Sequence, residues 1–328
     1  MSEAIGAAPV RRFALDADGR RVAFAILAAA ALFVVGDLVH PGFAGAASIE
    51  AVALNASFVG LVAAGQCFVV LVGGIDLSIP WVLNGAAILL VTASLGQNAR
   101  AGFAVALTLG MGALVGFVNG FGIAVLAVPA VVMTLAMNGV MEGLTLGLSG
   151  GLTCGACASY APPVVRAAVN GGFLGLPAAL WVWLFIIVAV TFVLGFTGFG
   201  RKTYAIGNNA LASRLAGVNV RAITILLYML SGMFSALAGI MLVGFGGQAS
   251  LGMGTPFLFQ SVAAVVIGGL DILGGRGNYV GVAAGSMSLM ALISVLLAVD
   301  MPEYGRSILY GVVILLLLLA YGRNRAAD

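Results

Sequence analysis

Long apolar runs divide this sequence, and they constrain its fold more than any other feature. A helix needs roughly 20 apolar residues, each rising about 1.5 Å, to cross a hydrocarbon layer about 30 Å thick. Runs of this kind predict ten spans, at residues 22–39, 50–72, 80–96, 101–121, 127–148, 178–197, 222–245, 257–271, 279–299 and 306–321. We therefore expect an all-α integral membrane protein with about ten transmembrane helices, of which the third and the eighth are short.

The composition excludes the main alternatives to a helical membrane protein. Of the 328 residues, 62% are hydrophobic and only 8% are charged, whereas an average soluble protein is about half apolar and roughly a quarter charged. So few charges exclude a soluble enzyme, a disordered chain and a fibrous protein. The net charge is only +3 and the basic residues are scattered, which leaves no basic face for a nucleic acid. A membrane β-barrel would show short alternating segments in place of long apolar runs.

The basic residues predict the orientation, because cytoplasmic loops retain Lys and Arg. With the N-terminus inside, 11 of the 14 Lys and Arg residues are cytoplasmic, and only Arg100, Arg166 and Arg306 are external. An even number of spans also returns Arg323 and Arg325 to the cytoplasm. Ten spans meet this condition, as would eight or twelve. We expect both termini in the cytoplasm.

These spans predict one transmembrane domain between two short tails. The first span resembles a signal peptide in having Arg20 and Arg21 before an apolar run, but its length and the even span count favour a retained helix. The expected parts are a cytoplasmic tail at 1–21, a transmembrane domain at 22–321 with an external loop at 149–177 and a cytoplasmic loop at 198–221, and a cytoplasmic tail at 322–328.

Patterns typical of an enzyme or a metal site are not found in the sequence. The lone histidine, His40, stands at a span end, as interfacial residues do, and a metal needs several converging ligands. Gly195 to Thr203 is close to the phosphate-binding pattern G-x-x-x-x-G-K-[ST], but it has an extra Arg and follows an apolar span. We expect no catalytic residue, metal or cofactor, so any ATP hydrolysis must come from another chain. Cys154 and Cys157 would form an external disulfide or remain free thiols, whereas Cys67 is expected to be a small apolar residue within a span.

Polar side chains within the spans are candidates for a functional role, because burying them in a bilayer is expensive. Most are uncharged amides, which suit hydroxyl-rich neutral solutes better than ions. The alternative is that they form hydrogen bonds between helices. The main candidates are Asn55, Gln66, Asn84, Asn138 and Glu142, and Asn119 is also expected at depth.

Glycines form two further patterns. Gly112, Gly116 and Gly120 are spaced four apart, which lets two helices approach closely. The segments 70–76 and 265–271 read VLVGGID and VVIGGLD. Internal repeats are frequent in transporters. However, two glycines and an acid would end any helix near an interface, so seven residues do not establish a repeat.

The most polar stretch of the chain is the loop between the sixth and seventh spans. Within it we expect a short helix at 209–216, capped by Asn208 or Asn209 and ended by Gly217. An ordinary basic loop would explain the composition equally well.

Two leucines distinguish this short helix from its flanks. Leu211 and Leu215 are four residues apart, so they lie on one face. An apolar edge between basic flanks indicates contact with a partner protein.

Three motifs carry a family resemblance. They are Gly73-Gly74-Ile75-Asp76-Leu77-Ser78, the loop at 200–221, and Ala263 to Gly269 followed by Gly274-Gly275-Arg276-Gly277. In this order and spacing, over residues 20–321, the chain resembles the ribose/xylose-type sugar permeases of bacterial ABC importers, with branched-chain amino acid permeases as more distant relatives. The resemblance implies an inner-membrane permease that pairs with a second copy or a paralogue. The implied partners are cytoplasmic ATP-binding-cassette ATPase subunits and a periplasmic solute-binding protein.

The resemblance also implies roles for individual segments. Gly73 to Ser78 and Gly268 to Gly277 would be turns at cytoplasmic span ends. Pro80 fits a helix start, whereas many relatives have small residues where this chain has the bulky Trp81, which would alter the lining of the path. The residues that would dock on the ATPase are Gly207, Asn208, Asn209, Leu211, Arg214, Leu215 and Gly217.

We therefore expect a permease that moves a monosaccharide or a related polyol into the cytoplasm. The main polar candidates within the spans would then line its translocation path. One alternative is an amino-acid permease of the same superfamily. A second is an autonomous secondary transporter, which would need a cluster of buried acids that the sequence does not indicate. A third is a structural subunit of another membrane complex.

Overall fold

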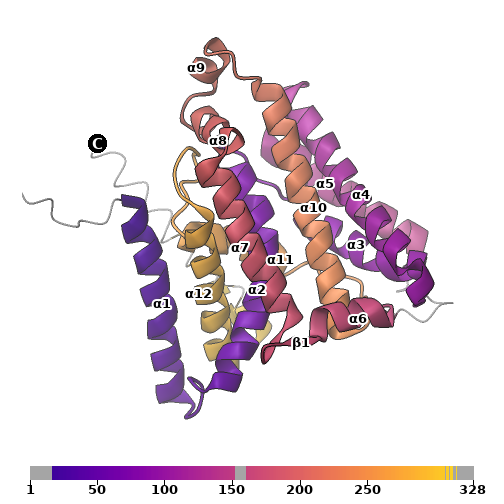
Figure 1. Cartoon of the computed structure of the whole chain (residues 1–328), viewed down its shortest axis with the longest axis vertical. Coiled ribbons are helices and arrows are strands. Elements are labelled where there is room, and N and C mark those ends of the chain that lie inside the picture. The colour runs from indigo at the N-terminus through magenta and orange to yellow at the C-terminus, as the bar shows by residue number, and fades with distance from the viewer. Residues whose placement is uncertain (1–16, 152–159, 307, 310, 313–314, 316–328) are drawn as a thin grey trace, which may run out of the picture.

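The computed structural model describes residues 17–151, 160–306, 308–309, 311–312 and 315, and this part is a bundle of helices (Figure 1). The helices are α1 (Ala17–Val39), α2 (Ala46–Val70), α3 (Ile79–Ser94), α4 (Asn98–Ala124), α5 (Ala130–Ser149), α6 (Pro163–Asn170), α7 (Ala178–Phe196), α8 (Gly198–Asn208), α9 (Ala210–Leu215), α10 (Val220–Gly246), α11 (Phe257–Ile267) and α12 (Tyr279–Ala298). A short antiparallel hairpin, β1 (Gly172–Phe173) and β2 (Leu176–Pro177), precedes α7.

Nine of the ten predicted spans coincide with these helices, and the tenth, 306–321, lies largely outside the described residues. Seven of the described helices are long and apolar enough to cross a bilayer, namely α1, α2, α4, α5, α7, α10 and α12. The prediction of an all-α membrane protein is therefore confirmed. The total of ten spans and the cytoplasmic position of the termini stay predictions.

The eighth predicted span is shorter than expected. It was expected to reach residue 271, but α11 ends at Ile267. The two glycines that follow explain the early end, because Gly269 has a φ of +82°, which lies in the left-handed region that favours glycine. At 11 residues α11 is only about 16 Å long, so it cannot cross the hydrocarbon layer alone.

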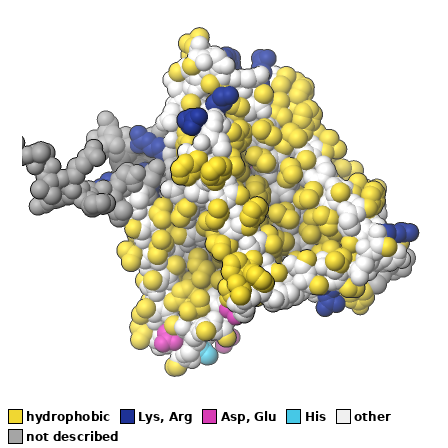
Figure 2. Space-filling model, viewed as in Figure 1, with side chains coloured by type: hydrophobic (Ala, Val, Ile, Leu, Met, Phe, Trp, Pro, Cys, Tyr) yellow, Lys and Arg dark blue, Asp and Glu magenta, His cyan; other side chains and the backbone are white. Residues whose placement is uncertain are grey.

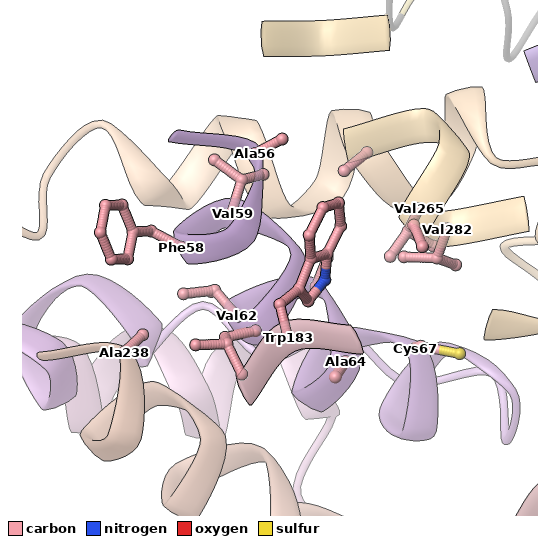
Figure 3. Close-up of a cluster of buried hydrophobic side chains, with 14 of the residues drawn as sticks. Ala56, Phe58, Val59, Val62, Ala64, Cys67, Trp183, Ala238, Val265 and Val282 are labelled. Atoms are coloured by element: carbon pink, nitrogen blue, oxygen red, sulfur yellow. The ribbon is translucent and has the colours of Figure 1, made fainter. Parts of the chain in front are cut away.

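Helix α2 forms the centre of the bundle. It contacts α7, α10, α11 and α12, and every residue from Ala56 to Val70 is buried. Figure 3 shows the indole of Trp183, from α7, lying between α2 and the side chains of Val265 and Val282. Gly60 leaves the space for this ring, because a Cβ there would collide with the indole nitrogen. The apolar character of α2 on all sides is what such burial requires.

Helices α4 and α10 pack closely through the predicted glycine pattern. A Cβ on Gly112 would collide with the backbone of Gly232, and one on Gly116 would collide with the carbonyl oxygen of Tyr228. A Cβ on Gly120 would come within 2.6 Å of the Ile225 Cα. The prediction that this pattern permits a close helix pair is confirmed.

The two ends of the bundle differ in charge. Lys and Arg side chains gather over α8 and α9 at one end, whereas acidic and histidine side chains gather at the opposite end below α1 and α2, and a few further basic side chains lie at the lower right of the view (Figure 2). His40 is exposed there, as expected for an interfacial residue. This separation agrees with the predicted orientation, but which end faces the cytoplasm stays a prediction.

The structure describes one of the three cysteines, Cys67. Cys67 is fully buried and free in α2, as expected for a small apolar residue. Cys154 and Cys157 lie outside the described residues. The described part of the segment predicted as an external loop contains α6 and the β1–β2 hairpin.

Candidate functional site

The segment joining α7 to α10 folds into two helices where we expected one. The predicted helix at 209–216 is confirmed as α9, and its cap is Asn209, whose Oδ1 accepts a hydrogen bond of 2.9 Å from the amide of Ala212. Gly217, with a φ of +83°, follows its end. Helix α8, which precedes α9, was not predicted. We call residues 198–217 the α8–α9 segment.

Asn208 ties the α8–α9 segment to the turn before α12 instead of capping α9. Its Nδ2 donates to the carbonyl oxygens of Tyr204, at 2.9 Å, and Gly275, at 3.2 Å. The hydroxyl of Tyr204 donates to the carbonyl oxygen of Gly277 at 2.8 Å. Gly207 fits closely against this turn, because a Cβ there would collide with the amide nitrogen of Gly275. Three positions of α8, 204, 207 and 208, therefore fix it on residues 275–277.

The same place brings together all three motifs that carry the family resemblance. The amide of Gly275 donates to the carbonyl oxygen of Leu71 at 2.9 Å, so the turn after α11 is bonded to the turn after α2. A Cβ on Gly207 would also collide with that Leu71 oxygen. A Cβ on Gly274 would lie 2.8 Å from the amide nitrogen of Gly73. These glycines let three backbones meet at one end of the bundle.

The two echoing segments do not share one conformation. In the first, the positive φ falls on Gly73, at +77°, whereas in the second it falls on Gly269, at +82°, one place later in the matching sequence. Asp76 is buried, with 1% of its surface exposed, but Asp271 is only half-buried and its Oδ1 accepts from the amide of Leu273. The two segments are therefore similar in sequence but do not form a structural repeat.

Helix α9 lies at the outer end of the α8–α9 segment (Figure 1). Leu211 is 66% exposed and Leu215 is 81% exposed, and Arg214 between them is also exposed. Large exposed apolar side chains at a charged end of a membrane protein are a feature of docking surfaces.

Asp76 is the centre of a buried polar cluster within the bundle. Its Oδ1 accepts hydrogen bonds from the amide of Ser78, at 3.0 Å, and the hydroxyl of Ser78, at 2.6 Å. Its Oδ2 accepts from the hydroxyl of Ser231 on α10 at 2.7 Å. Among the described residues no Lys or Arg hydrogen-bonds to this carboxylate, so hydroxyl and amide donors alone stabilise it.

Other helices complete the cluster around the 71–78 turn, which links α2 to α3. The amide of Asp76 donates to Gln66 Oε1 at 3.3 Å, and Asn119 Nδ2 donates to the hydroxyl of Ser78 at 2.9 Å. The hydroxyl of Thr134 donates to the carbonyl oxygen of Ile75 at 3.4 Å. Four helices, α2, α4, α5 and α10, therefore hold this turn.

The position of Asp76 corrects the expectation that Gly73 to Ser78 form a turn at a span end. Ser231, its partner, is about 16 Å along α10 from Val220, the first residue of that helix. Ser78 is also 1% exposed. The turn begins at the end of the bundle, where Gly73 meets Gly274, and then folds back between the helices. An ionisable residue at such a depth is a functional candidate.

Three polar groups next to the carboxylate have no hydrogen-bond partner among the described residues: Gln66 Nε2, Asn119 Oδ1 and the hydroxyl of Tyr228. The Tyr228 hydroxyl lies against Gly74, where an added Cβ would collide with it. Buried polar groups are normally paired, so these spare groups call for a structural or functional explanation.

The predicted polar candidates separate into four groups. Gln66, like Asn119, belongs to the Asp76 cluster. Asn84 is buried on α3 and neither end of its amide has a partner within the described part of the chain. Asn138 and Glu142 are half-buried on α5. Asn55 is exposed and its Nδ2 bonds to Ala51 of its own helix, so the structure does not bring it to the others.

Sequence reasoning missed the centre of this cluster. Asp76, Ser231 and Tyr228 were not among the predicted candidates, and Asp76 was interpreted as part of an interfacial turn. The available signal was an acid within a strongly apolar chain, which is a functional candidate by default. In the described residues no group of three or more His, Cys, Asp or Glu side chains comes together that could hold a metal ion.

Comparison with known proteins gives consistent matches over nearly the whole chain. The sequence pattern of the family described as branched-chain amino acid transport system / permease component matches residues 48–318. The chain is 31% identical over 307 residues to the autoinducer 2 import system permease protein LsrC of Escherichia coli (strain K12 / DH10B), covering 92% of this chain and 87% of that protein. The LsrC proteins of Yersinia enterocolitica and Salmonella paratyphi B are 31% and 32% identical over 94% of this chain, covering 85% and 88% of their own lengths. No solved structure gave a significant match.

Proposed function

The chain belongs to the family of branched-chain amino acid transport system permease components, and we propose that within it this chain imports a monosaccharide or a related neutral polyol. Like the other permeases of this family, it is a multi-pass protein of the inner membrane and is not itself catalytic. The observation that carries the proposal is the 31% identity to autoinducer 2 import permeases over 92% of the chain.

The polar groups inside the bundle support a neutral solute. Gln66, Asn84 and Asn119 are buried amides with spare hydrogen-bonding atoms, and such groups pair well with hydroxyls. A free amino acid would bring a carboxylate and an ammonium group, and burying these charged groups costs more free energy than burying hydroxyls. The family description names branched-chain amino acids, so an amino-acid permease is the second candidate.

Two half-buried residues of α5 are further candidates for the translocation path. Asn138 and Glu142 lie within a helix long enough to span the bilayer. Glycines 139, 143 and 147 of the same helix have open space where a Cβ would be. A carboxylate is costly against lipid, so we place this face of α5 toward the path and toward a second permease copy or a paralogue.

The α8–α9 segment would receive the motion of the ATPase subunits. Leu211 and Leu215 would enter a groove of the ATPase, with Arg214 at its rim. The support is their exposure on α9, together with the hydrogen bonds that fix α8 to the ends of the helical bundle. A periplasmic binding protein would deliver the solute at the opposite end.

A reconstituted complex tests the proposal. The permease, its ATPase subunits and its binding protein are placed in liposomes, and ATP-dependent uptake is compared for labelled monosaccharides, autoinducer 2 and leucine. We expect uptake of one or more of the hydroxyl-bearing solutes and none of leucine. The binding protein alone, screened by thermal shift, should respond to the same solutes. Leucine uptake without sugar or autoinducer 2 uptake would replace the first candidate by the second.

A further inference from the structure

We propose that Asp76 is the fixed acceptor in a hydrogen-bond exchange that positions α10, with Ser231 as its donor in the conformation described here and Tyr228 as its donor in a second conformation. The inference rests on the proposed function only in placing this exchange within the transport cycle. Asp76, Ser231 and Tyr228 are then positioning residues and do not themselves contact the solute.

The two donors lie on the same face of α10. Tyr228 and Ser231 are three residues apart, so they are neighbours on the helix surface and about 4.5 Å apart along its axis. Both face the 71–78 turn, since Ser231 bonds to Asp76 at 2.7 Å and the Tyr228 hydroxyl lies against Gly74. Because a tyrosine side chain reaches further than a serine side chain, a shift of α10 much shorter than one helical turn would bring the Tyr228 hydroxyl to Asp76 as Ser231 leaves it.

The spare hydroxyl of Tyr228 is what gives the second conformation its donor. Tyr228 is 1% exposed, and its hydroxyl has no hydrogen-bond partner in the part of the chain that the structure describes. A buried tyrosine hydroxyl normally finds one. A carboxylate oxygen can accept from either donor, so each conformation keeps the charge of Asp76 hydrogen-bonded.

Three glycines lie against this part of α10. A Cβ on Gly65 of α2 would lie 2.8 Å from the Ser231 Cα. Gly116 of α4 packs against the backbone of Tyr228 in the same way, and Gly74 of the turn packs against its hydroxyl. Because glycines have no side chains to interlock with α10, an axial shift meets fewer steric barriers here than in an ordinary core. Packed helices change position between discrete arrangements of this kind.

The outer end of the 71–78 turn connects the exchange to the α8–α9 segment. Leu71 accepts the amide of Gly275, and Gly275 is held by Asn208 of α8. Asp76 follows Leu71 by five residues in the chain. A displacement of α8 is therefore delivered to the turn that carries the acceptor.

Distance measurements on α10 test the exchange directly. Spin labels are placed at the exposed positions 103 on α4 and 226 on α10. The permease that carries them has Cys67, Cys154 and Cys157 replaced, and it is diluted with unlabelled permease. We expect two distances that differ by less than about 4.5 Å, the axial spacing of the two donors, with ATP and vanadate changing their populations in the complete complex. Ser231→Ala should increase the population of the second conformation by about tenfold, and Tyr228→Phe should reduce it by about tenfold, as expected for loss of a hydrogen bond to a charged acceptor.

Matched variants separate an exchange from general loosening. Ser235→Ala removes another buried hydroxyl of α10, which bonds to Ser231 O within the helix, and Tyr279→Phe removes the hydroxyl that bonds to Gly60 O. Neither should change the populations. The proposal is wrong if Ser231→Ala and Tyr228→Phe shift the populations in the same direction, if the controls shift them as much, or if a transporting wild-type complex shows one distance throughout. Failure of the proposed function would appear separately, as absence of uptake, while the resting populations of the permease still report on the exchange.

Discussion

Replacement of Leu215 by aspartate is the strongest test of how the permease is driven. Leu215 is 81% exposed on α9, so the substitution removes no internal packing and the permease should insert and assemble normally. If the side chain is buried in an ATPase groove, its loss costs about 1.5–3 kcal/mol of binding free energy. That is roughly a tenfold to hundredfold loss of affinity, and the added carboxylate would increase it.

The assay compares solute uptake with permease-stimulated ATP hydrolysis in reconstituted complexes. Both should fall together in Leu215→Asp, whereas Arg214→Ala, at the rim of the groove, should cost less than about 1 kcal/mol and leave most activity. Leu174→Asp is the matched control, because Leu174 is 77% exposed in the β1–β2 hairpin and should not meet the ATPase. Wild-type uptake and stimulation in an assembled Leu215→Asp complex would refute the docking role of α9.

Three further outcomes follow from the structure. In a background without native cysteines, a cysteine at position 174 should react with an impermeant maleimide from outside intact cells. A cysteine at position 210 should react only after permeabilisation. The reverse result would invert the predicted topology. Gly116→Ala should destabilise the permease by about 1–3 kcal/mol in thermal unfolding, because the added Cβ meets the α10 backbone. Gly110→Ala is the control and should not destabilise it, because a Cβ at Gly110 meets nothing within 4 Å. Equal effects would contradict the close α4–α10 contact. Tyr204→Phe removes the hydrogen bond to the turn before α12, which is worth about 1 kcal/mol. It should lower solute uptake per ATP hydrolysed with little change in assembly. An unchanged ratio of uptake to hydrolysis would show that this bond does not transmit the motion.

Features set by neighbouring residues were predicted well from the sequence. The apolar runs predicted nine helices that the structure describes, because a span depends on length and local hydropathy alone. The α9 helix was found from an asparagine cap and a terminal glycine, both of which act within one turn. The contact between α4 and α10 followed from the spacing of Gly112, Gly116 and Gly120, although the partner helix could not be named.

Features set by distant residues were not predicted. Asp76 and Ser231 are 155 residues apart in the chain, and no local pattern shows that the turn after α2 folds back between the helices. Helix α8 was missed because Arg201 and Lys202 gave its sequence the composition of a loop. The tie between Asn208 and Gly275 joins positions 67 residues apart, so Asn208 was interpreted only as a possible cap.

The donors around Asp76 explain how a buried carboxylate can serve a moving protein. A Lys or Arg partner would hold the carboxylate in one strong pair, and separating such a pair within the bundle would leave two uncompensated charges. Hydroxyl and amide donors stabilise the same carboxylate with weaker bonds that can be exchanged one at a time. In the described residues Ser78 supplies two of these bonds from the turn itself, and only the third comes from α10, through Ser231. A shift of α10 relative to the turn therefore breaks one bond of three, and Tyr228 is placed to restore it, so Asp76 stays hydrogen-bonded while the helix and the turn move past each other.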